Sequence, residues 1–218
     1  MSVVGFDFGN LQSVIAVARN RGIDVLQNEV GHRMTPSAVA FSGRQRFIGN
    51  EAASQAMSNP KNTITNLKRF IGRKHDDAEL PREMNFVTFK TVPGARGFTH
   101  ISVNYDDKQE DFAPEQITAA LLQKFKGVAE NGLDGAKVTD CVIGVPGWWT
   151  DVQRRGLLDA ANIAGLNVLR LINETTAIAL QYGQKQTKNA HTDCHAHGSK
   201  RAVEKVSILS AVRAAHPL

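Results

Sequence analysis

Three short runs of alternating apolar and polar residues open the chain. They cover residues 3–8, 13–19 and 23–28, and the turn signals Gly9-Asn10 and Asn20-Arg21-Gly22 separate them. Alternation with a period of two is typical of strands, and glycine and asparagine mark tight connections between strands. The pattern predicts three strands that form an antiparallel meander.

From about residue 36 to residue 112 the chain is more polar and its periodic segments are short. We expect an inserted α+β subdomain here, with one hairpin that turns at Pro93-Gly94. The expected strands are residues 37–41, 46–48, 86–92 and 98–105, and the expected helices are residues 50–58 and 62–71.

Helical periodicity begins after Ala113. Apolar residues recur at helical spacing from Ile117 to Val128. Further along, Thr150 and Gln153 have the spacing of a capping box, which predicts the start of a second helix.

The last part of the pattern alternates helices with buried strands. Strands are expected at residues 138–145 and 166–172, and a third helix is expected to begin at Glu174. Including the opening meander, the order is three strands, helix, strand, helix, strand, helix. This order predicts an α/β fold of the ribonuclease-H-like type, which actin-like and sugar-kinase-like ATPases share.

The composition is that of a globular protein. Apolar residues make up 42% of the chain and charged residues 22%, which is ordinary, and no apolar run approaches the roughly 20 residues that cross a bilayer. The N-terminus carries no signal-peptide pattern, and the two cysteines, Cys141 and Cys194, form no disulfide framework. We therefore expect a cytoplasmic protein without a membrane partner.

The net charge of +5 raises the question of nucleic-acid binding. Residues 184–218 hold six Lys/Arg and two acidic residues, which leaves 20 basic and 19 acidic residues in the first 183. The basic character therefore belongs to the tail and not to a folded binding face. We expect no nucleic-acid partner.

The first candidate for chemistry is the segment GFDFGN at the end of the opening strand. Asp7 ends an apolar strand and Gly9 follows it. A carboxylate in this place can hold Mg²⁺ through its water ligands, and a glycine lets backbone N–H groups approach a phosphate. An aspartate that caps a hairpin turn is the alternative that these residues leave open.

Two other residues have the chemistry to complete such a site. Glu174 follows an apolar strand and opens a helix, a position where anions and metals gather, although first-turn acids also occur simply to complement the helix dipole. Lys68 can reach a terminal phosphate, although a Lys-Arg pair can also be a solvated helix face. Two acids at strand ends and one distant lysine together favour a site for Mg²⁺ and a nucleotide tail.

Longer motifs make this hypothesis more specific. The segments GFDFGN, NTITNLKRFIGR and VIGVPGWWTDVQRRGLLDAANIAGLNVLRLINETTAIALQYG follow one another as in the nucleotide-binding domains of the seventy-kilodalton heat-shock protein family. The chain resembles that family over residues 1–183, least over residues 76–112. The run AVARNRGIDVLQNE looks like the fungal members of its large, 110-kilodalton co-chaperone branch.

The resemblance implies lobe I of a chaperone ATPase domain. Its core subdomain would comprise residues 1–35 and 113–183, its inserted subdomain residues 36–112, and a divergent, disordered tail residues 184–218. The family continues past this lobe into a second phosphate loop and a second lobe that grips the adenosine. A nucleotide held by one wall of a cleft stays hydrated, so we expect low affinity, and the uncovered wall should favour self-association.

The resemblance also implies a role for each matched residue, with ATP and Mg²⁺ as cofactors. Lys68 is the implied catalytic lysine, in contact with the γ-phosphate and the attacking water. Asp7 and Glu174 hold the hydrated Mg²⁺, and Pro146 couples the nucleotide state to the rest of the protein. The implied first phosphate-binding turn consists of Asp7, Gly9, Asn10 and Leu11.

One departure from the family pattern concerns hydrolysis. Common chaperone ATPases have two threonines where this chain has Asn10 and Leu11, so a hydroxyl near the phosphate is lost. This weakens the case for hydrolysis more than the case for binding. It agrees with the co-chaperone branch, whose members act as nucleotide exchange factors and holdases for partner chaperones of the seventy-kilodalton family and meet unfolded polypeptide in the full-length protein.

Two other functions stay open. The chain could be an interaction fragment, or a truncated by-product, without nucleotide function. A sugar-kinase-like phosphotransferase is disfavoured because no sugar-site motif is present. The tail residues His191, Cys194, His195 and His197 fit no standard zinc spacing, so we expect no metal site there, and Trp148-Trp149 is expected to pack rather than to stack on bases.

Overall fold

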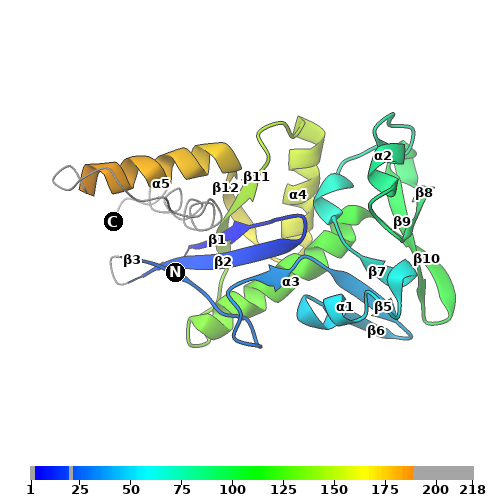
Figure 1. Ribbon diagram of the computed structural model, residues 1–218, viewed down its shortest axis with the longest axis horizontal. Coiled ribbons are helices and arrows are strands. Elements are labelled where there is room, and N and C mark those ends of the chain that lie inside the picture. Colours follow the sequence, from blue (N-terminus) through cyan, green and yellow to red (C-terminus); the bar gives the residue numbers. More distant parts are fainter. Residues whose placement is uncertain (1–2, 20–21, 189–218) are drawn as a thin grey trace.

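The computed structural model describes residues 3–19 and 22–188. At its centre lies a sheet with the strand order β12-β11-β1-β2-β3 (Figure 1). The opening strands pair antiparallel as a meander, as the alternation of the sequence predicts. These strands are β1 (Val4–Asp7), β2 (Gln12–Arg19) and β3 (Gly22–Val25), and the short β4 (Thr35–Pro36) pairs with the start of β2.

The other side of the sheet is parallel. β11 (Asp140–Val145) pairs with β1, and β12 (Asn167–Asn173) pairs with β11. Parallel strands need crossover connections, and two helices supply them: α3 (Pro114–Gly132) precedes β11, and α4 (Asp151–Ile163) joins β11 to β12. A further helix, α5 (Glu174–Lys188), follows β12. This arrangement confirms the predicted ribonuclease-H-like α/β class.

The predicted capping box opens α4. The Thr150 side chain accepts a hydrogen bond from the Gln153 backbone N–H, and the Gln153 side chain accepts one from the Thr150 N–H at 3.0 Å. Reciprocal bonds of this kind satisfy helix donors that would otherwise lack partners. The start of α4, next to the end of β11, is therefore tightly defined.

Residues 36–112 form two further small sheets, seen at the right of Figure 1. The first has the order β6-β5-β7 and the second the order β10-β9-β8. Their strands are β5 (Val39–Ser42), β6 (Gln45–Ile48), β7 (Thr63–Ile64), β8 (Lys90–Pro93), β9 (Thr99–Tyr105) and β10 (Lys108–Phe112). The helices are α1 (Asn50–Ser54), α2 (Leu80–Met84) and the 3₁₀ turns η1 (Pro60–Asn62), η2 (Leu67–Arg69) and η3 (Ala95–Gly97).

The expected helix over residues 62–71 is wrong. Thr63 and Ile64 pair with β5 as strand β7, because β-branched residues fit a sheet better than a helix. Asn66 then takes a left-handed backbone with a φ of 55°, which a helix cannot include. The η2 turn that follows is a single 3₁₀ turn and carries Lys68.

Three other expectations need correction. α1 ends at Ser54 and not at residue 58, and α5 continues to Lys188, past the expected boundary at Gly183. Strand β8 begins at Lys90 and not at residue 86. The sequence analysis missed β10, which gives no apolar signal because four of its five residues are exposed. Residues 189–218, including the His/Cys-rich segment, lie outside the described residues.

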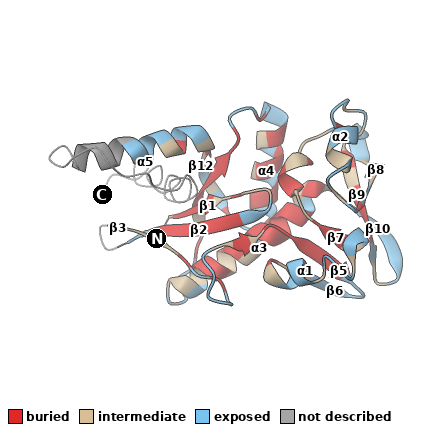
Figure 2. Ribbon diagram, viewed as in Figure 1, coloured by how far each residue is buried: buried red, intermediate tan, exposed pale blue. Residues whose placement is uncertain are grey.

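The helix α3 joins the two halves of the core. It contacts β2 of the central sheet and also β5, β6 and β9 of the small sheets, and its apolar side chains are buried (Figure 2). The Phe125 ring, for example, lies 6.0 Å from the ring of Phe6 in β1. One continuous core therefore fixes residues 36–112 relative to the central sheet.

Candidate functional site

The parallel strands bring the two predicted acids to one edge of the sheet. Asp7 ends β1 and pairs in register with Gly144 of β11, which in turn pairs with Ile172 of β12. Since neighbouring strands lie about 4.8 Å apart, Asp7 and Ile172 are separated by about 10 Å. Glu174 follows at the end of β12 and opens α5. We call the carboxyl ends of β1, β11 and β12 the strand-end edge; this is where open α/β sheets bind ligands.

Gly9 lies in the tight turn from β1 to β2. A Cβ atom there would lie 2.1 Å from the carbonyl oxygen of Gln12, so no other residue fits without moving the backbone. The Gly9 N–H donates to the Ser13 hydroxyl at 3.3 Å, and that hydroxyl lies 2.8 Å from the Ser37 hydroxyl. The turn is closely packed against Gln12 and Ser13, and no side chain at Gly9 blocks the approach of a ligand.

Asn10 and Leu11 occupy the rest of this turn. The side-chain oxygen Oδ1 of Asn10 is buried and has no hydrogen-bond partner among the described residues. A buried acceptor without a donor is costly, and a water ligand of a bound cation would supply the donor. The Leu11 side chain is 70% exposed and offers no polar atom. The turn therefore fits a hydrated Mg²⁺ and lacks a hydroxyl for hydrolytic chemistry.

Lys68 reaches the same edge from the inserted region. Although it is a lysine, it is only 6% exposed, and its Nζ donates to Oε1 of Glu174 in an ion pair. A buried ammonium group needs such a partner, because an unpaired buried charge is costly. The Glu174 side chain is 37% exposed, so it can also meet a ligand from solvent. The structure thus brings these two predicted residues into direct contact.

Arg154, which the sequence reasoning missed, ties the strand-end edge together. Its Nη2 donates to the carbonyl of Pro146 at 3.2 Å and to Oδ1 of Asn173 at 2.8 Å, and its Nε donates to the carbonyl of Trp149 at 3.2 Å. It thereby joins the loop after β11 to the residue that precedes Glu174. An arginine in the first turns of a helix that leaves a strand end is the signal that could have indicated it.

Pro146 is buried at the end of β11, where the prediction expected a coupling residue. Its carbonyl is one of the acceptors of Arg154. Of the two neighbouring tryptophans, Trp149 is buried as expected, whereas Trp148 is 68% exposed, so the packing prediction is wrong for Trp148.

The described residues give little support to a reactive thiol, a metal cluster or a membrane span. Burial, with a smaller contribution from the Asp140 carboxylate, raises the pKa of the Cys141 thiol to about 12, so this thiol stays protonated and unreactive. Residues 3–19 and 22–188 contain no cluster of three or more metal-ligating His, Cys, Asp or Glu side chains. None of the described helices is both long and apolar enough to span a bilayer.

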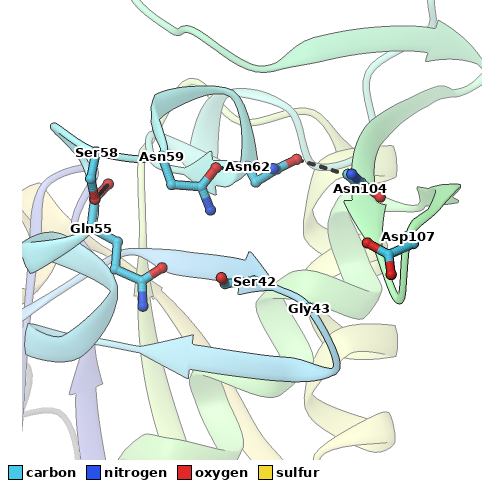
Figure 3. Close-up of a pocket in the computed structure, with 8 residues that line it drawn as sticks. All are labelled: Ser42, Gly43, Gln55, Ser58, Asn59, Asn62, Asn104 and Asp107. Carbon is cyan, nitrogen blue, oxygen red and sulfur yellow. Dashed lines mark hydrogen bonds between the residues drawn. The ribbon is translucent and has the colours of Figure 1, made fainter.

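A polar hollow of about 560 Å³ lies apart from this edge, within the inserted region (Figure 3). Its lining offers amides, hydroxyls and the carboxylate of Asp107 but no lysine or arginine, so it is unsuited to a triphosphate. The Asn104 N–H donates to Oδ1 of Asn62 across its wall at 2.8 Å. The lining residues are Ser42, Gly43, Gln55, Ser58, Asn59, Asn62, Asn104 and Asp107.

Comparison with known proteins decides the family. The family profile described as Hsp70 protein matches residues 3–199 of this chain. The chain belongs to the Hsp70 family. Hsp70-family domains bind ATP or ADP with Mg²⁺ in general, which agrees with acids, a lysine and a glycine turn at the strand-end edge.

The relatives of this Hsp70-family chain include large members. It is 49% identical over 193 residues to heat shock 70 kDa protein 14 of Arabidopsis thaliana, and the matched region covers 88% of the chain and 23% of that protein. It is also 49% identical over 183 residues to the 97 kDa heat shock protein of Mesocentrotus franciscanus, and that match covers 84% of the chain and 20% of the relative. The resemblance to the large branch is confirmed. The chain spans about a quarter or less of the length of these relatives.

We expect the substitution Arg154→Ala to destabilise the Hsp70-family fold by about 2 kcal/mol, because Asn173 and two carbonyls lose a charged donor. The control Arg155→Ala removes a neighbouring arginine whose ion pair with Asp151 is exposed, and it should cost less than about 0.5 kcal/mol. Urea unfolding followed by circular dichroism measures both. Equal losses for the two variants would contradict the bridging role of Arg154.

Proposed function

We propose that this chain is the first lobe of the nucleotide-binding domain of a large-branch Hsp70 co-chaperone, and that it binds Mg-ATP at the strand-end edge. The observation that carries the proposal is the convergence of Asp7, Lys68 and Glu174, which come from three distant parts of the sequence. A buried lysine paired with a partly exposed glutamate, at the sheet edge from which the Gly9 turn starts, is suited to phosphate binding.

Each residue takes a specific role in the proposed complex. Asp7 and Glu174 hold water ligands of Mg²⁺, since Mg²⁺ favours carboxylates and keeps part of its hydration shell. Lys68 contacts the γ-phosphate, and the backbone at Gly9 approaches the phosphates closely. When bound, Mg²⁺ would neutralise phosphate charge and orient the triphosphate.

The proposal favours binding over hydrolysis. The exposed Leu11 and the amide of Asn10 supply no hydroxyl near the phosphates. Lys68 is also engaged by Glu174 before any ligand arrives. An incoming phosphate has to compete with that carboxylate, so tight binding depends on contacts that a second lobe would add.

For the whole protein we propose the role of a cytoplasmic nucleotide exchange factor and holdase that works with a seventy-kilodalton chaperone. Support comes from the large relatives and from a series of polar contacts that leads away from the site. Glu174 adjoins Asn173, Asn173 accepts from Arg154, and Arg154 donates to Pro146. A change at the nucleotide edge is thereby tied to the loop after β11.

Calorimetric titration of the chain with Mg-ATP tests the binding proposal. We expect Asp7→Asn and Lys68→Ala each to weaken binding by about tenfold or more, the value of a lost charged hydrogen bond. Lys108→Ala is the matched control, because Lys108 is an exposed lysine of β10 in the inserted region. Unchanged affinity in both site variants would sink the proposed site.

An interaction fragment without nucleotide function is the second candidate. It is favoured by apolar side chains that stay exposed on β12 and α5, namely Leu169, Leu180 and Tyr182. Such side chains mark contact surfaces.

Capture of a purified seventy-kilodalton chaperone by the immobilised chain, with and without Mg-ATP, separates the two functions. The co-chaperone proposal predicts that Mg-ATP changes the captured amount and that Lys68→Ala abolishes this change. Capture that is indifferent to nucleotide in both forms would favour the interaction fragment.

A further inference from the structure

The turn that carries Lys68 is too short for its own backbone hydrogen bonds to fix its position. η2 is a single 3₁₀ turn of three residues, and such turns have poor hydrogen-bond geometry. Leu67 of this turn and the residues that follow it, Phe70 and Ile71, are fully buried, which fixes the depth of the turn in the core. The direction of the neighbouring backbone depends on what contacts the chain just beyond it.

Glu115 provides one such contact from α3. Its Oε1 accepts a hydrogen bond from the backbone N–H of Gly72 at 2.9 Å. Glu115 lies in the first turn of α3, where a carboxylate is also favoured by the helix dipole. A charged acceptor on a backbone donor makes a strong hydrogen bond. The chain directly after η2 is therefore anchored to α3.

The second contact is with α4, and glycines make it possible. Gly72 has a φ of +64°, and a Cβ there would lie 2.8 Å from the Cα of Gln153. A Cβ at Gly156 would lie 2.9 Å from Cγ2 of Ile71 and 3.0 Å from Oε1 of Glu115. The Glu115 carboxylate therefore fits between the Gly72 backbone and the face of α4 at Gly156.

The anchor is transmitted to Lys68 through a short, bonded segment. The N–H groups of Phe70 and Ile71 both donate to the carbonyl of Leu67, at 2.9 and 3.3 Å. A shift of Gly72 therefore moves the whole turn. Lys68, in the middle of that turn, would lose its alignment with Glu174.

We infer that Glu115 is a positioning residue for Lys68: its carboxylate holds the backbone at Gly72 and thereby keeps the lysine ammonium at the strand-end edge. This role in nucleotide binding rests on the proposed function. The geometric part of the inference, that Glu115 keeps Lys68 buried and paired, concerns the chain itself and can be tested without nucleotide.

The test measures the reactivity of Lys68 toward acetic anhydride by mass spectrometry of the nucleotide-free chain, with exposed Lys108 as the internal reference. We expect Glu115→Ala to raise the acetylation rate of Lys68 by about tenfold. The loss of one charged hydrogen bond shifts the equilibrium between buried and exposed Lys68 by about this factor. Glu115→Gln keeps an oxygen acceptor for the Gly72 N–H, so Lys68 should stay protected, within about twofold of the unchanged chain.

This pair of variants separates positioning from a simple effect on helix stability. Both substitutions remove the negative charge from the first turn of α3, so a role limited to the helix dipole predicts the same result for alanine and glutamine. Equal reactivity of Lys68 in the two variants, or unchanged reactivity in Glu115→Ala, would overturn the inference.

Gly156→Ala provides an independent route if Glu115→Ala fails to fold. Alanine favours a helix over glycine, while its Cβ would press on Ile71 and on the Glu115 carboxylate. We expect higher reactivity of Lys68 in a chain that remains folded by circular dichroism. Protection equal to that of the unchanged chain would count against the inference.

Mg-ATP titration then links positioning to binding. As a single substitution, Glu115→Ala should weaken Mg-ATP binding. In a chain that already carries Lys68→Ala it should have no further effect, because both substitutions act through the same ammonium group. Additive effects would contradict the inference. If the unchanged chain binds no Mg-ATP, the proposed function fails, whereas the acetylation result still decides the role of Glu115.

Discussion

The parallel pairing of β1, β11 and β12 is the constraint on which the candidate site depends. Parallel strands end at the same edge of a sheet, so Asp7 and Glu174 lie at one edge although they are near opposite ends of the described chain. The pairing in turn requires crossover helices. Of these, α3 contacts β5, β6 and β9 of the inserted region, and α4 lies against Ile71 and Gly72. The same topology therefore places both acids and supports the lysine that faces them.

The polar residues at this edge form one connected set. Lys68 pairs with Glu174, and Arg154 joins Asn173, the neighbour of Glu174, to the loop after β11 at Pro146. Each member satisfies a charge or a carbonyl that would otherwise be unpaired. Under the proposed function, a phosphate that draws Lys68 away from Glu174 would act on this set, and nucleotide binding would reach the loop after β11 in this way.

The sequence predicted the central sheet, its helices and the strand-end positions of Asp7 and Glu174. These features could be predicted because periodicity and strand ends are recognised from neighbouring residues. The surroundings of Lys68 were not predictable in that way. The expected helix over residues 62–71 was wrong because Thr63 and Ile64 pair with a strand more than twenty residues earlier. Arg154 was missed because its acceptors, two of them backbone carbonyls, come from separate elements. The role proposed for Lys68 comes from the family resemblance, whereas the structure shows how Lys68 is held, by its ion pair with Glu174.

Paramagnetic broadening by Mn²⁺ in place of Mg²⁺, with ATP present, tests the central claim most directly. A metal–nucleotide complex at the strand-end edge should broaden the amide resonances of Gly9 and Glu174 and leave those of Asp140 and Asn167, at the opposite ends of β11 and β12, sharp. The strongest broadening at Asn59 and Asp107, in the polar hollow of the inserted region, or broadening without any preference for the strand-end edge, would contradict the account.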